Sequence, residues 1–239
     1  MNVLFIGNSF SQDATRYLHQ ISDDEIFVRN LYIGGCSLET HVTNVKEANA
    51  YYEYQKNGRK LKMTSINDAL TKKKWDYVSI QQVSQLSGMI DSYEPFTEFL
   101  VNYIKEKCPK AKIVFHRTWA YSDDSTHGGF ANYDWDRKKT YDAIVKTTSE
   151  ISERYSLPII PSGDAIEKGR ELPEFDMSRG GMSLNRDGFH LTLDYGRYLA
   201  GLTLFRFFTG KSAATVTYEP EETDPAICAK LKALVDTVL

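Results

Sequence analysis

Cysteine is scarce in this sequence, and the spacing of metal-ligating residues is irregular. Among 239 residues there are only three cysteines, Cys36, Cys108 and Cys228, with no C-x-x-C pair. An odd, sparse set of this kind indicates neither a disulfide framework nor a zinc site, and we expect at least two of the thiols to be buried. His116 and His127 have no carboxylate or thiol at a regular offset, so we predict no metal and no cofactor.

The chain also lacks a charge excess and a long apolar run. It carries 29 Lys and Arg against 32 Asp and Glu, a net charge of −3. The lysine runs at 72–74 and 138–139 are local rather than a basic stripe, so we expect no nucleic-acid partner. The apolar block at 199–208 is interrupted by Arg206 and is shorter than the roughly 20 residues that a membrane-spanning helix needs. No membrane span is predicted.

No targeting segment is visible at the N-terminus. The chain begins MNVLFIGNSF, without a basic leading region or a small-residue cleavage site. The sequence as given therefore predicts a cytoplasmic protein, and a periplasmic or secreted one if a signal peptide has been removed. The oligomeric state stays open.

The residues that are present predict a folded α/β domain. Aromatic residues are plentiful, with 12 Phe, 15 Tyr and 3 Trp, and they supply apolar surface to offset the chain entropy lost on folding. No repeat or low-complexity linker occurs, so we predict a single domain over 1–239. Short apolar runs predict strands at 2–6, 25–33, 77–81, 112–116 and 158–160. Helical periodicity occurs at 13–21, 38–50, 65–73, 96–107, 133–155, 165–171, 193–208 and 224–238.

This alternation predicts a five-stranded, mostly parallel sheet with helices on both faces. The segment 51–63, with a turn at Asn57-Gly58, predicts a hairpin inserted on the surface. In parallel sheets, chemistry gathers at the carboxyl ends of the strands. Polar residues directly after a strand are therefore the candidates for a functional site.

Gly7-Asn8-Ser9 follows the first strand directly. The glycine permits a tight turn that presents the Ser9 hydroxyl at the edge of the sheet, where it could act as a nucleophile. Two other interpretations stay open. Ser9 or Ser11 could simply cap the next helix, or the turn could bind the phosphate of a nucleotide, although no G-x-G-x-x-G follows.

Near the other end of the sequence, Asp187 and His190 form an Asp-x-x-His motif. A serine hydroxyl needs a base to take its proton, and an imidazole base needs a carboxylate to fix its tautomer. The motif supplies both groups within one turn. Taken alone, it could also be a helix-capping aspartate beside an unrelated histidine.

Together these two blocks resemble the SGNH (GDSL-type) hydrolase superfamily. Members carry a Gly-Asp-Ser or Gly-Asn-Ser block, a glycine after the second strand, an Asn after the third and a C-terminal Asp-x-x-His, and the order here is the same from residue 3 to about 200. The detail looks most like a bacterial branch near the carbohydrate acetylesterases. The resemblance implies a three-layer, flavodoxin-like fold. It implies Ser9 as nucleophile, His190 as general base and Asp187 as the residue that orients it.

The resemblance also implies an oxyanion hole, and here the sequence departs from the family pattern. The backbone N–H groups of Ser9 and Gly35 match two of the donors, although Gly34 is possible in place of Gly35. The third block reads DYVSIQQVSQLSG and contains no Asn. We expect Gln85 or Gln81 to replace it, since a Gln carboxamide offers the same N–H donors on a longer stem. Alternatively, these glutamines only satisfy backbone groups at the strand end.

The loop after the fourth predicted strand carries Trp119, Tyr121, His127 and Phe130. Aromatic rings stack on sugar faces, which favours a substrate wall for an acylated carbohydrate, although Trp119 and Tyr121 could equally be core residues that anchor the loop. The sequence thus predicts a serine esterase that acts above all on O-acetyl groups of carbohydrates. The alternative is a catalytically weakened or inactive carbohydrate-binding protein on the same fold.

Overall fold

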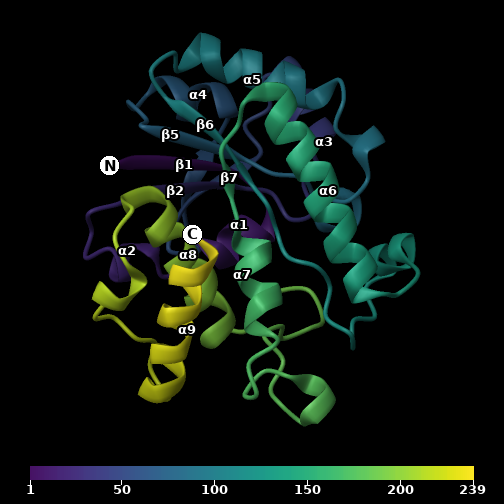
Figure 1. Cartoon of the computed structure of the whole chain (residues 1–239). Helices are drawn as coiled ribbons and strands as arrows, with labels where there is room; N and C mark the ends of the chain where they lie inside the picture. The colour runs from purple at the N-terminus through teal and green to yellow at the C-terminus, as the bar shows by residue number, and fades with distance from the viewer.

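The first strand is buried on both faces, and this sets the layering of the molecule. In β1 (Asn2–Gly7), Val3 and Phe5 belong to one apolar cluster, whereas Leu4 and Ile6 belong to another. Successive side chains of a strand point to opposite faces, so both faces of the sheet must be covered. The computed structural model describes residues 1–239 and shows helices on both faces (Figure 1). The predicted three-layer α/β fold is confirmed.

The sheet has seven strands rather than the predicted five, in the order β4-β3-β2-β1-β5-β6-β7. The strands after β1 are β2 (Phe27–Tyr32), β3 (Tyr52–Lys56), β4 (Arg59–Thr64), β5 (Tyr77–Ile80), β6 (Lys112–His116) and β7 (Ile159–Ile160). The pairs β2–β1, β1–β5, β5–β6 and β6–β7 are parallel.

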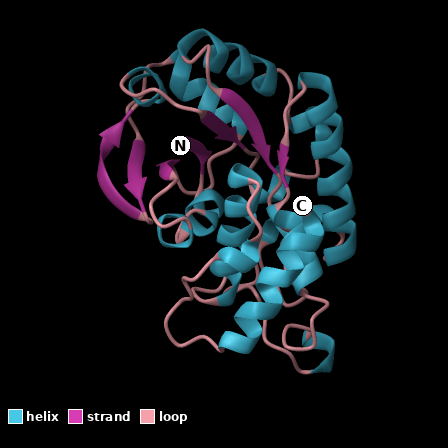
Figure 2. Ribbon diagram, turned by 60° about the vertical axis from the view of Figure 1, so that its left-hand side comes forward, coloured by secondary structure: helices cyan, strands magenta, loops and turns pink.

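The two additional strands come from the hairpin predicted at 51–63. Its first strand pairs antiparallel with β2 and its second pairs antiparallel with the first, so the hairpin extends one edge of the sheet (Figure 2). It is not a surface insertion, because it uses the backbone groups of β2 that would otherwise form an open edge. The Tyr52 side chain is fully buried there.

The helices divide between the two faces of the sheet. They are α1 (Ser9–Ala14), α2 (Leu18–Ile21), α3 (Leu38–Lys46), α4 (Ile66–Thr71), α5 (Phe96–Lys107), α6 (Arg137–Tyr155), α7 (Ser162–Gly169), α8 (Tyr195–Thr209) and α9 (Pro225–Val238). Helices α1, α2, α7, α8 and α9 pack on the face of Val3 and Phe5. Helices α3, α4 and α5, with part of α6, cover the opposite face (Figure 1).

The main difference from the predicted helices lies directly after β1. The helix expected at 13–21 is two short helices, and the first of them begins at Ser9. The cause is Asn8, whose side-chain oxygen accepts a hydrogen bond from the Phe10 N–H and so caps α1 four residues earlier. This start places Ser9 at the carboxyl end of β1.

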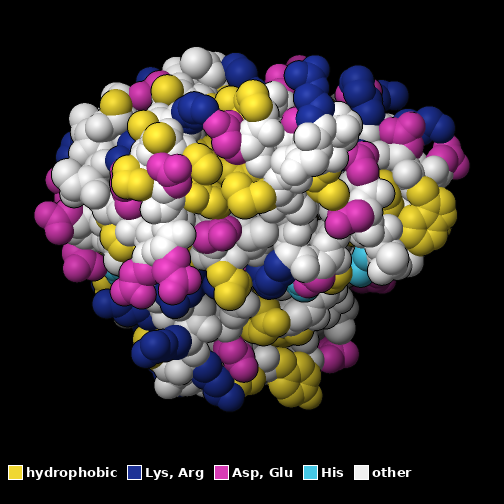
Figure 3. All heavy atoms as spheres, turned by 90° about the horizontal axis from the view of Figure 1, so that it is seen from below, with side chains coloured by type: hydrophobic (Ala, Val, Ile, Leu, Met, Phe, Trp, Pro, Cys, Tyr) yellow, Lys and Arg dark blue, Asp and Glu magenta, His cyan; other side chains and the backbone are white.

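Three further features bear on the predictions made from composition: the cysteines, the apolarity of the helices and the distribution of charge. All three cysteines are buried and free, in agreement with the prediction of buried thiols. None of the helices combines the length and apolarity that crossing a membrane would require. Acidic and basic side chains are interspersed on the face seen in Figure 3.

Candidate active site

The structure brings Ser9 and His190 together although 181 positions separate them in the sequence. Ser9 Oγ lies 2.8 Å from His190 Nε2, and His190 Nδ1 lies 2.7 Å from Asp187 Oδ2. Both distances fit hydrogen bonds. The three residues predicted as nucleophile, base and orienting carboxylate therefore form one continuous hydrogen-bonded chain.

The turn that carries Ser9 depends on close packing at Gly7. A Cβ atom at Gly7 would lie 2.3 Å from Ser11 Oγ and 3.1 Å from the Gln81 side chain, so no larger residue fits. Asn8 then caps α1, which makes Ser9 its first residue. Since the first N–H groups of a helix have no partner within the helix, the Ser9 N–H is available to a ligand.

Asp187 is held as a carboxylate by the bonds it accepts. Its Oδ1 accepts from the His190 N–H at 2.7 Å and from the Phe189 N–H at 3.3 Å, while Oδ2 faces the imidazole. Partial burial alone would raise the pKa of Asp187, but these hydrogen bonds and the nearby imidazole outweigh it and lower the pKa. An ionised Asp187 fixes the proton of His190 on Nδ1 and leaves Nε2 free to accept the proton of Ser9.

Unpaired N–H donors gather beside Ser9. Gly35 has a φ of +63°, a conformation that favours glycine, and its N–H has no hydrogen-bond partner in the structure. Gln85 lines the same cavity, and its Nε2 has no partner within the protein. The structure thus places Ser9, Gly35 and Gln85 around one cavity, which Gly34 also lines.

Gln81, the competing candidate, is placed elsewhere. Its side chain is 1% exposed and does not line the cavity. Its Nε2 donates to Asn8 Oδ1 at 2.9 Å, and its Oε1 bonds His116 Nδ1 at 2.9 Å. The prediction of Gln81 as an oxyanion donor is wrong, because both ends of its carboxamide are occupied inside the core.

Trp119 and Tyr121 do not form the predicted substrate wall. Their side chains are 1% and 2% exposed, and neither lines the cavity. Trp119 stacks on Phe10 with ring centroids 4.4 Å apart and donates from Nε1 to the Phe189 carbonyl. Both are core residues that anchor the loop, and Phe130, packed against Tyr121, is buried with them.

His127, by contrast, does line the cavity. Its Nδ1 accepts a hydrogen bond from the Gly129 N–H at 3.0 Å, so the proton of a neutral imidazole lies on Nε2. Nε2 has no partner in the protein. Its ring packs against Tyr121 and Phe189, with centroids 5.3 and 4.5 Å away. These contacts fix the position of the ring in the cavity wall.

The cavity at this site has a volume of about 290 Å³. Besides the residues above, it is lined by Phe10, Tyr32, Val83, Ser84 and Phe189. The sequence prediction missed Tyr32, Ser84 and Phe189. Tyr32 ends β2, and Ser84 follows β5 closely, so the search for polar residues after strands could have found both. Phe189 lies inside the Asp-x-x-His motif and could have been named with it.

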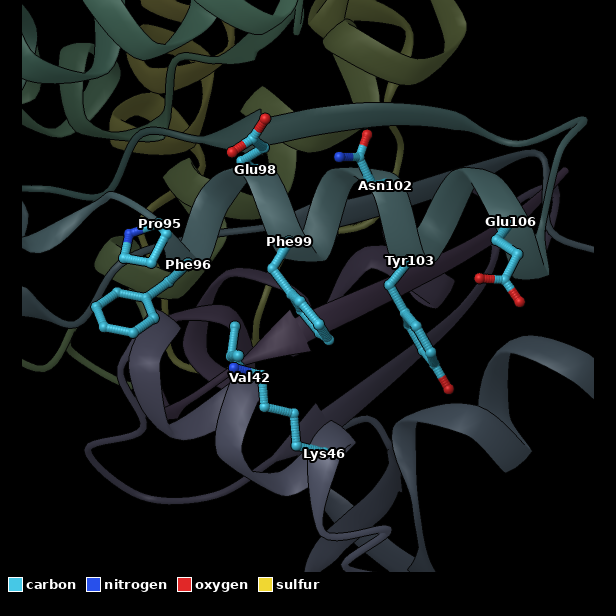
Figure 4. Close-up of a pocket in the computed structure, with 9 residues that line it drawn as sticks. All are labelled: Val42, Lys46, Pro95, Phe96, Glu98, Phe99, Asn102, Tyr103 and Glu106. Carbon is cyan, nitrogen blue, oxygen red and sulfur yellow. The ribbon is translucent and has the colours of Figure 1, made fainter.

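A larger groove of about 410 Å³ lies between α3 and α5 (Figure 4). Phe99 and Tyr103 stack there with ring centroids 6.1 Å apart, and Lys46 Nζ lies 5.2 Å from the Phe99 ring. It contains no serine, cysteine or histidine, so it offers no nucleophile paired with a base. The cavity of about 290 Å³ is the candidate active site because Ser9 and His190, which are hydrogen-bonded to each other, both line it. No group of three or more His, Cys, Asp or Glu side chains has a geometry that could hold a metal.

The fold and this hydrogen-bonded chain define a protein of the SGNH hydrolase architecture. A protein from Slackia heliotrinireducens that is assigned to the SGNH hydrolases superposes with a TM-score of 0.58 at 19% identity, over 85% of this chain and 96% of that chain. The acetyl xylan esterase AlAXEase gives a TM-score of 0.54 at 13% identity, over 87% and 100%. Identities this low show a shared fold, which confirms the predicted resemblance at that level.

A closer likeness identifies the family. The family described as "Domain of unknown function (DUF4886)" matches residues 2–234. The crystal structure of a DUF4886 family protein from Bacteroides uniformis ATCC 8492 superposes with a TM-score of 0.90 at 40% identity, over 100% of this chain and 94% of that chain. The chain therefore belongs to the DUF4886 family. No curated protein matches the sequence.

Proposed function

We propose that this protein is a serine esterase that hydrolyses carboxylic esters, with O-acetyl groups on carbohydrates as its substrates. The observation that carries the proposal is the chain from Ser9 Oγ through His190 to Asp187, with links of 2.8 and 2.7 Å. The fold shared with the SGNH hydrolases and with an acetyl xylan esterase supports the same class of reaction.

The first half-reaction acylates the enzyme. Ser9 Oγ attacks the carbonyl carbon of the ester while its proton passes to His190 Nε2. The ionised Asp187 stabilises the imidazolium that forms and keeps the ring in place. His190 then gives the proton to the leaving alcohol oxygen, and an acyl group remains on Ser9. In the second half-reaction, water attacks this acyl group with His190 again as base. The bond between the acyl carbon and Ser9 Oγ then breaks, His190 returns the proton to Oγ, and the carboxylic acid leaves.

The negative charge of each tetrahedral intermediate falls on the carbonyl oxygen. We assign its donors to the N–H groups of Ser9 and Gly35, with Gln85 Nε2 as the third. The support is their common position on one cavity and their lack of partners in the protein. Such donors act through preorganisation, because they need no rearrangement when the charge develops.

The size and polarity of the cavity favour a small acyl group on a hydroxyl-rich alcohol. At about 290 Å³ it is at the small end of ligand cavities, which typically span about 300–1,000 Å³. His127 Nε2–H and the Tyr32 hydroxyl provide donors at its walls. Burial and the nearby carboxylates Glu53 and Asp13 raise the pKa of Tyr32, so its hydroxyl stays neutral and able to donate.

A substrate panel tests the proposal. Acetylated sugars and short- and long-chain nitrophenyl esters are offered to the wild type and to Ser9→Ala, together with a serine-directed phosphonate. We expect turnover of acetyl esters and labelling of Ser9 in the wild type, and neither in the variant. Preference for long acyl chains would refute the carbohydrate assignment. Sugar binding without turnover or labelling would point to a carbohydrate-binding protein instead.

A further inference from the structure

A fully buried carboxylate lies one turn beyond Ser9 on α1. Asp13 is 0% exposed. Its Oδ1 accepts from Arg197 Nε at 2.8 Å, and its Oδ2 accepts from Arg186 Nη1 at 3.1 Å. Oδ2 also accepts from the Leu191 N–H at 2.9 Å. A buried charge with this many donors is strongly specified in position, since a carboxylate without them would not be stable in the core.

These bonds hold both ends of the segment that carries the Asp-x-x-His motif. Arg186 immediately precedes Asp187, and Leu191 immediately follows His190. The segment is closed on itself as well, because the Arg186 N–H donates to the His190 carbonyl at 2.9 Å and the Arg186 guanidinium also bonds the Leu191 carbonyl. Asp13 is thus the anchor of a closed loop rather than a partner of one side chain.

Ser9 and Asp13 share one face of α1, because residues four apart on a helix are neighbours. Ser9 therefore bonds the imidazole of His190. Asp13 bonds the Arg186 side chain before the motif and the Leu191 N–H after it. Resting on the esterase function proposed above, we infer that Asp13 is a positioning residue. It sets the distance between His190 Nε2 and Ser9 Oγ without contacting the substrate.

A purely structural ion pair would behave differently, and the chain offers a matched control. Asp164 on α7 bonds Arg117 Nη1 through both oxygens at 3.0 and 3.1 Å, and it accepts from the Tyr141 hydroxyl. Asp164 is also a largely buried carboxylate on an arginine, with a side chain that is 22% exposed. None of these three residues lines the catalytic cavity.

The experiment compares Asp13→Asn with Asp164→Asn. For Asp13→Asn we expect kcat on an acetyl ester to fall by about 10²-fold with KM within roughly threefold, the size of effect that a misplacement of about 1 Å causes. Labelling of Ser9 by a phosphonate should slow in parallel. Asp164→Asn should lose stability but keep kcat within about threefold. Equal losses of kcat in the two variants, or an unchanged kcat in folded Asp13→Asn, would overturn the inference.

Arg186 provides a second route if Asp13→Asn does not fold. Its side chain is 33% exposed, and in Arg186→Gln the bonds of Asp13 to Arg197 and Leu191 remain. We expect kcat to fall by about tenfold in Arg186→Gln and to recover largely in Arg186→Lys, which keeps the charge. Similar activity in the wild type, Arg186→Gln and Arg186→Lys would contradict the positioning role.

Hydrogen exchange separates this inference from the proposed function. Exchange of residues 186–191 should accelerate in Asp13→Asn and stay unchanged in Asp164→Asn, whether or not the protein hydrolyses esters. A wild type that neither turns over esters nor is labelled at Ser9 would refute the esterase. Unchanged exchange of 186–191 in Asp13→Asn would refute the anchor.

Discussion

The molecule contains two hydrogen-bonded chains of side chains, each of which joins a serine, a histidine and a side-chain oxygen of a third residue. In the first, His190 bonds Ser9 at 2.8 Å and Asp187 at 2.7 Å. In the second, His116 bonds Ser162 Oγ at 3.0 Å and Gln81 Oε1 at 2.9 Å. Both histidines use Nε2 for the serine and Nδ1 for the other partner, so the bonding pattern alone does not distinguish the two.

Access and charge do distinguish them. His116, Ser162 and Gln81 are at most 1% exposed, whereas Ser9 and His190 line a cavity. Burial lowers the pKa of His116 to about 3, and its partner Gln81 is a neutral amide that cannot stabilise an imidazolium. A hydrogen-bonded imidazole therefore becomes a useful base only where a carboxylate supports its charged form and a substrate can reach the hydroxyl.

Removing the two serine hydroxyls should give the largest contrast. In Ser9→Ala we expect turnover of an acetyl ester to fall by about 10⁴-fold or more, because Ser9 Oγ is the side-chain group that His190 Nε2 bonds. In Ser162→Ala we expect activity within about tenfold and a loss of about 1–3 kcal/mol in the free energy of unfolding, since His116 Nε2 is left without a partner. Steady-state kinetics and urea denaturation measure both quantities. Comparable activity losses would mean that the two chains do not differ in function.

Neutralising the carboxylate of the first chain should have the next largest effect. Asp187→Asn makes the first chain resemble the second, so we expect kcat to fall by about 10²- to 10⁴-fold as the imidazolium loses its support. The matched control is Asp142→Asn, which removes an exposed carboxylate of α6 that bonds only Lys138. Stopped-flow measurement of the acylation burst reports the step directly. Full activity in Asp187→Asn would exclude the carboxylate from the mechanism.

The two glutamines should separate activity from stability. Gln85→Ala removes one proposed oxyanion donor, and we expect kcat to fall by about 10²-fold with the unfolding free energy nearly unchanged. Gln81→Ala leaves Asn8 Oδ1 short of a donor and His116 Nδ1 unpaired in the core, so we expect a loss of about 1–3 kcal/mol in stability. The reverse pattern, with kcat sensitive to Gln81 and stability to Gln85, would exchange their roles.

The elements that could be predicted from the sequence are those whose evidence is local. The turn around Ser9 and the Asp187-x-x-His190 motif each lie within a few residues, and the order of strands and helices places them at the same end of the sheet. The hairpin at 51–63 was correctly placed, but not its pairing with β2. Pairing is a long-range choice, and the hairpin's own pattern is the same whether it lies on the surface or extends an edge.

The residues that the sequence misjudged are those whose side-chain direction depends on packing. Gln81 and Gln85 are equal candidates by residue type, yet Gln81 directly follows β5 and points into the core, where Asn8 and His116 provide its partners. Gln85 lies beyond it in a 3-10 turn, Ser84–Leu86, and lines the cavity. Trp119 is aromatic and follows a strand, which fits a substrate wall as well as a core. Its stacking on Phe10 and its hydrogen bond to the Phe189 carbonyl decide between them, and both partners lie far from Trp119 in the sequence.

The last contrast concerns the dependence of stability on pH, and it involves the histidine of the second chain. Burial lowers the pKa of both His116 and His41 to about 3, against about 6.5 for an ordinary histidine. Between these values the unfolded chain binds a proton at each site and the folded chain does not, so each histidine stabilises the fold fully above pH 6.5. This stability is lost as the pH falls toward 3, by about 1.4 kcal/mol per pH unit for each histidine.

We therefore expect the free energy of unfolding to fall on acidification from pH 6.5 to 4.5, and to fall less steeply in His116→Gln. His41→Gln is the matched variant, because His41 is equally buried but bonds Cys36 and Tyr52 and no member of the second chain. Urea denaturation at successive pH values gives the slope for each protein. An equal reduction of the slope in both variants would assign the effect to burial alone. A slope unchanged in both would show that neither imidazole is held neutral by the core.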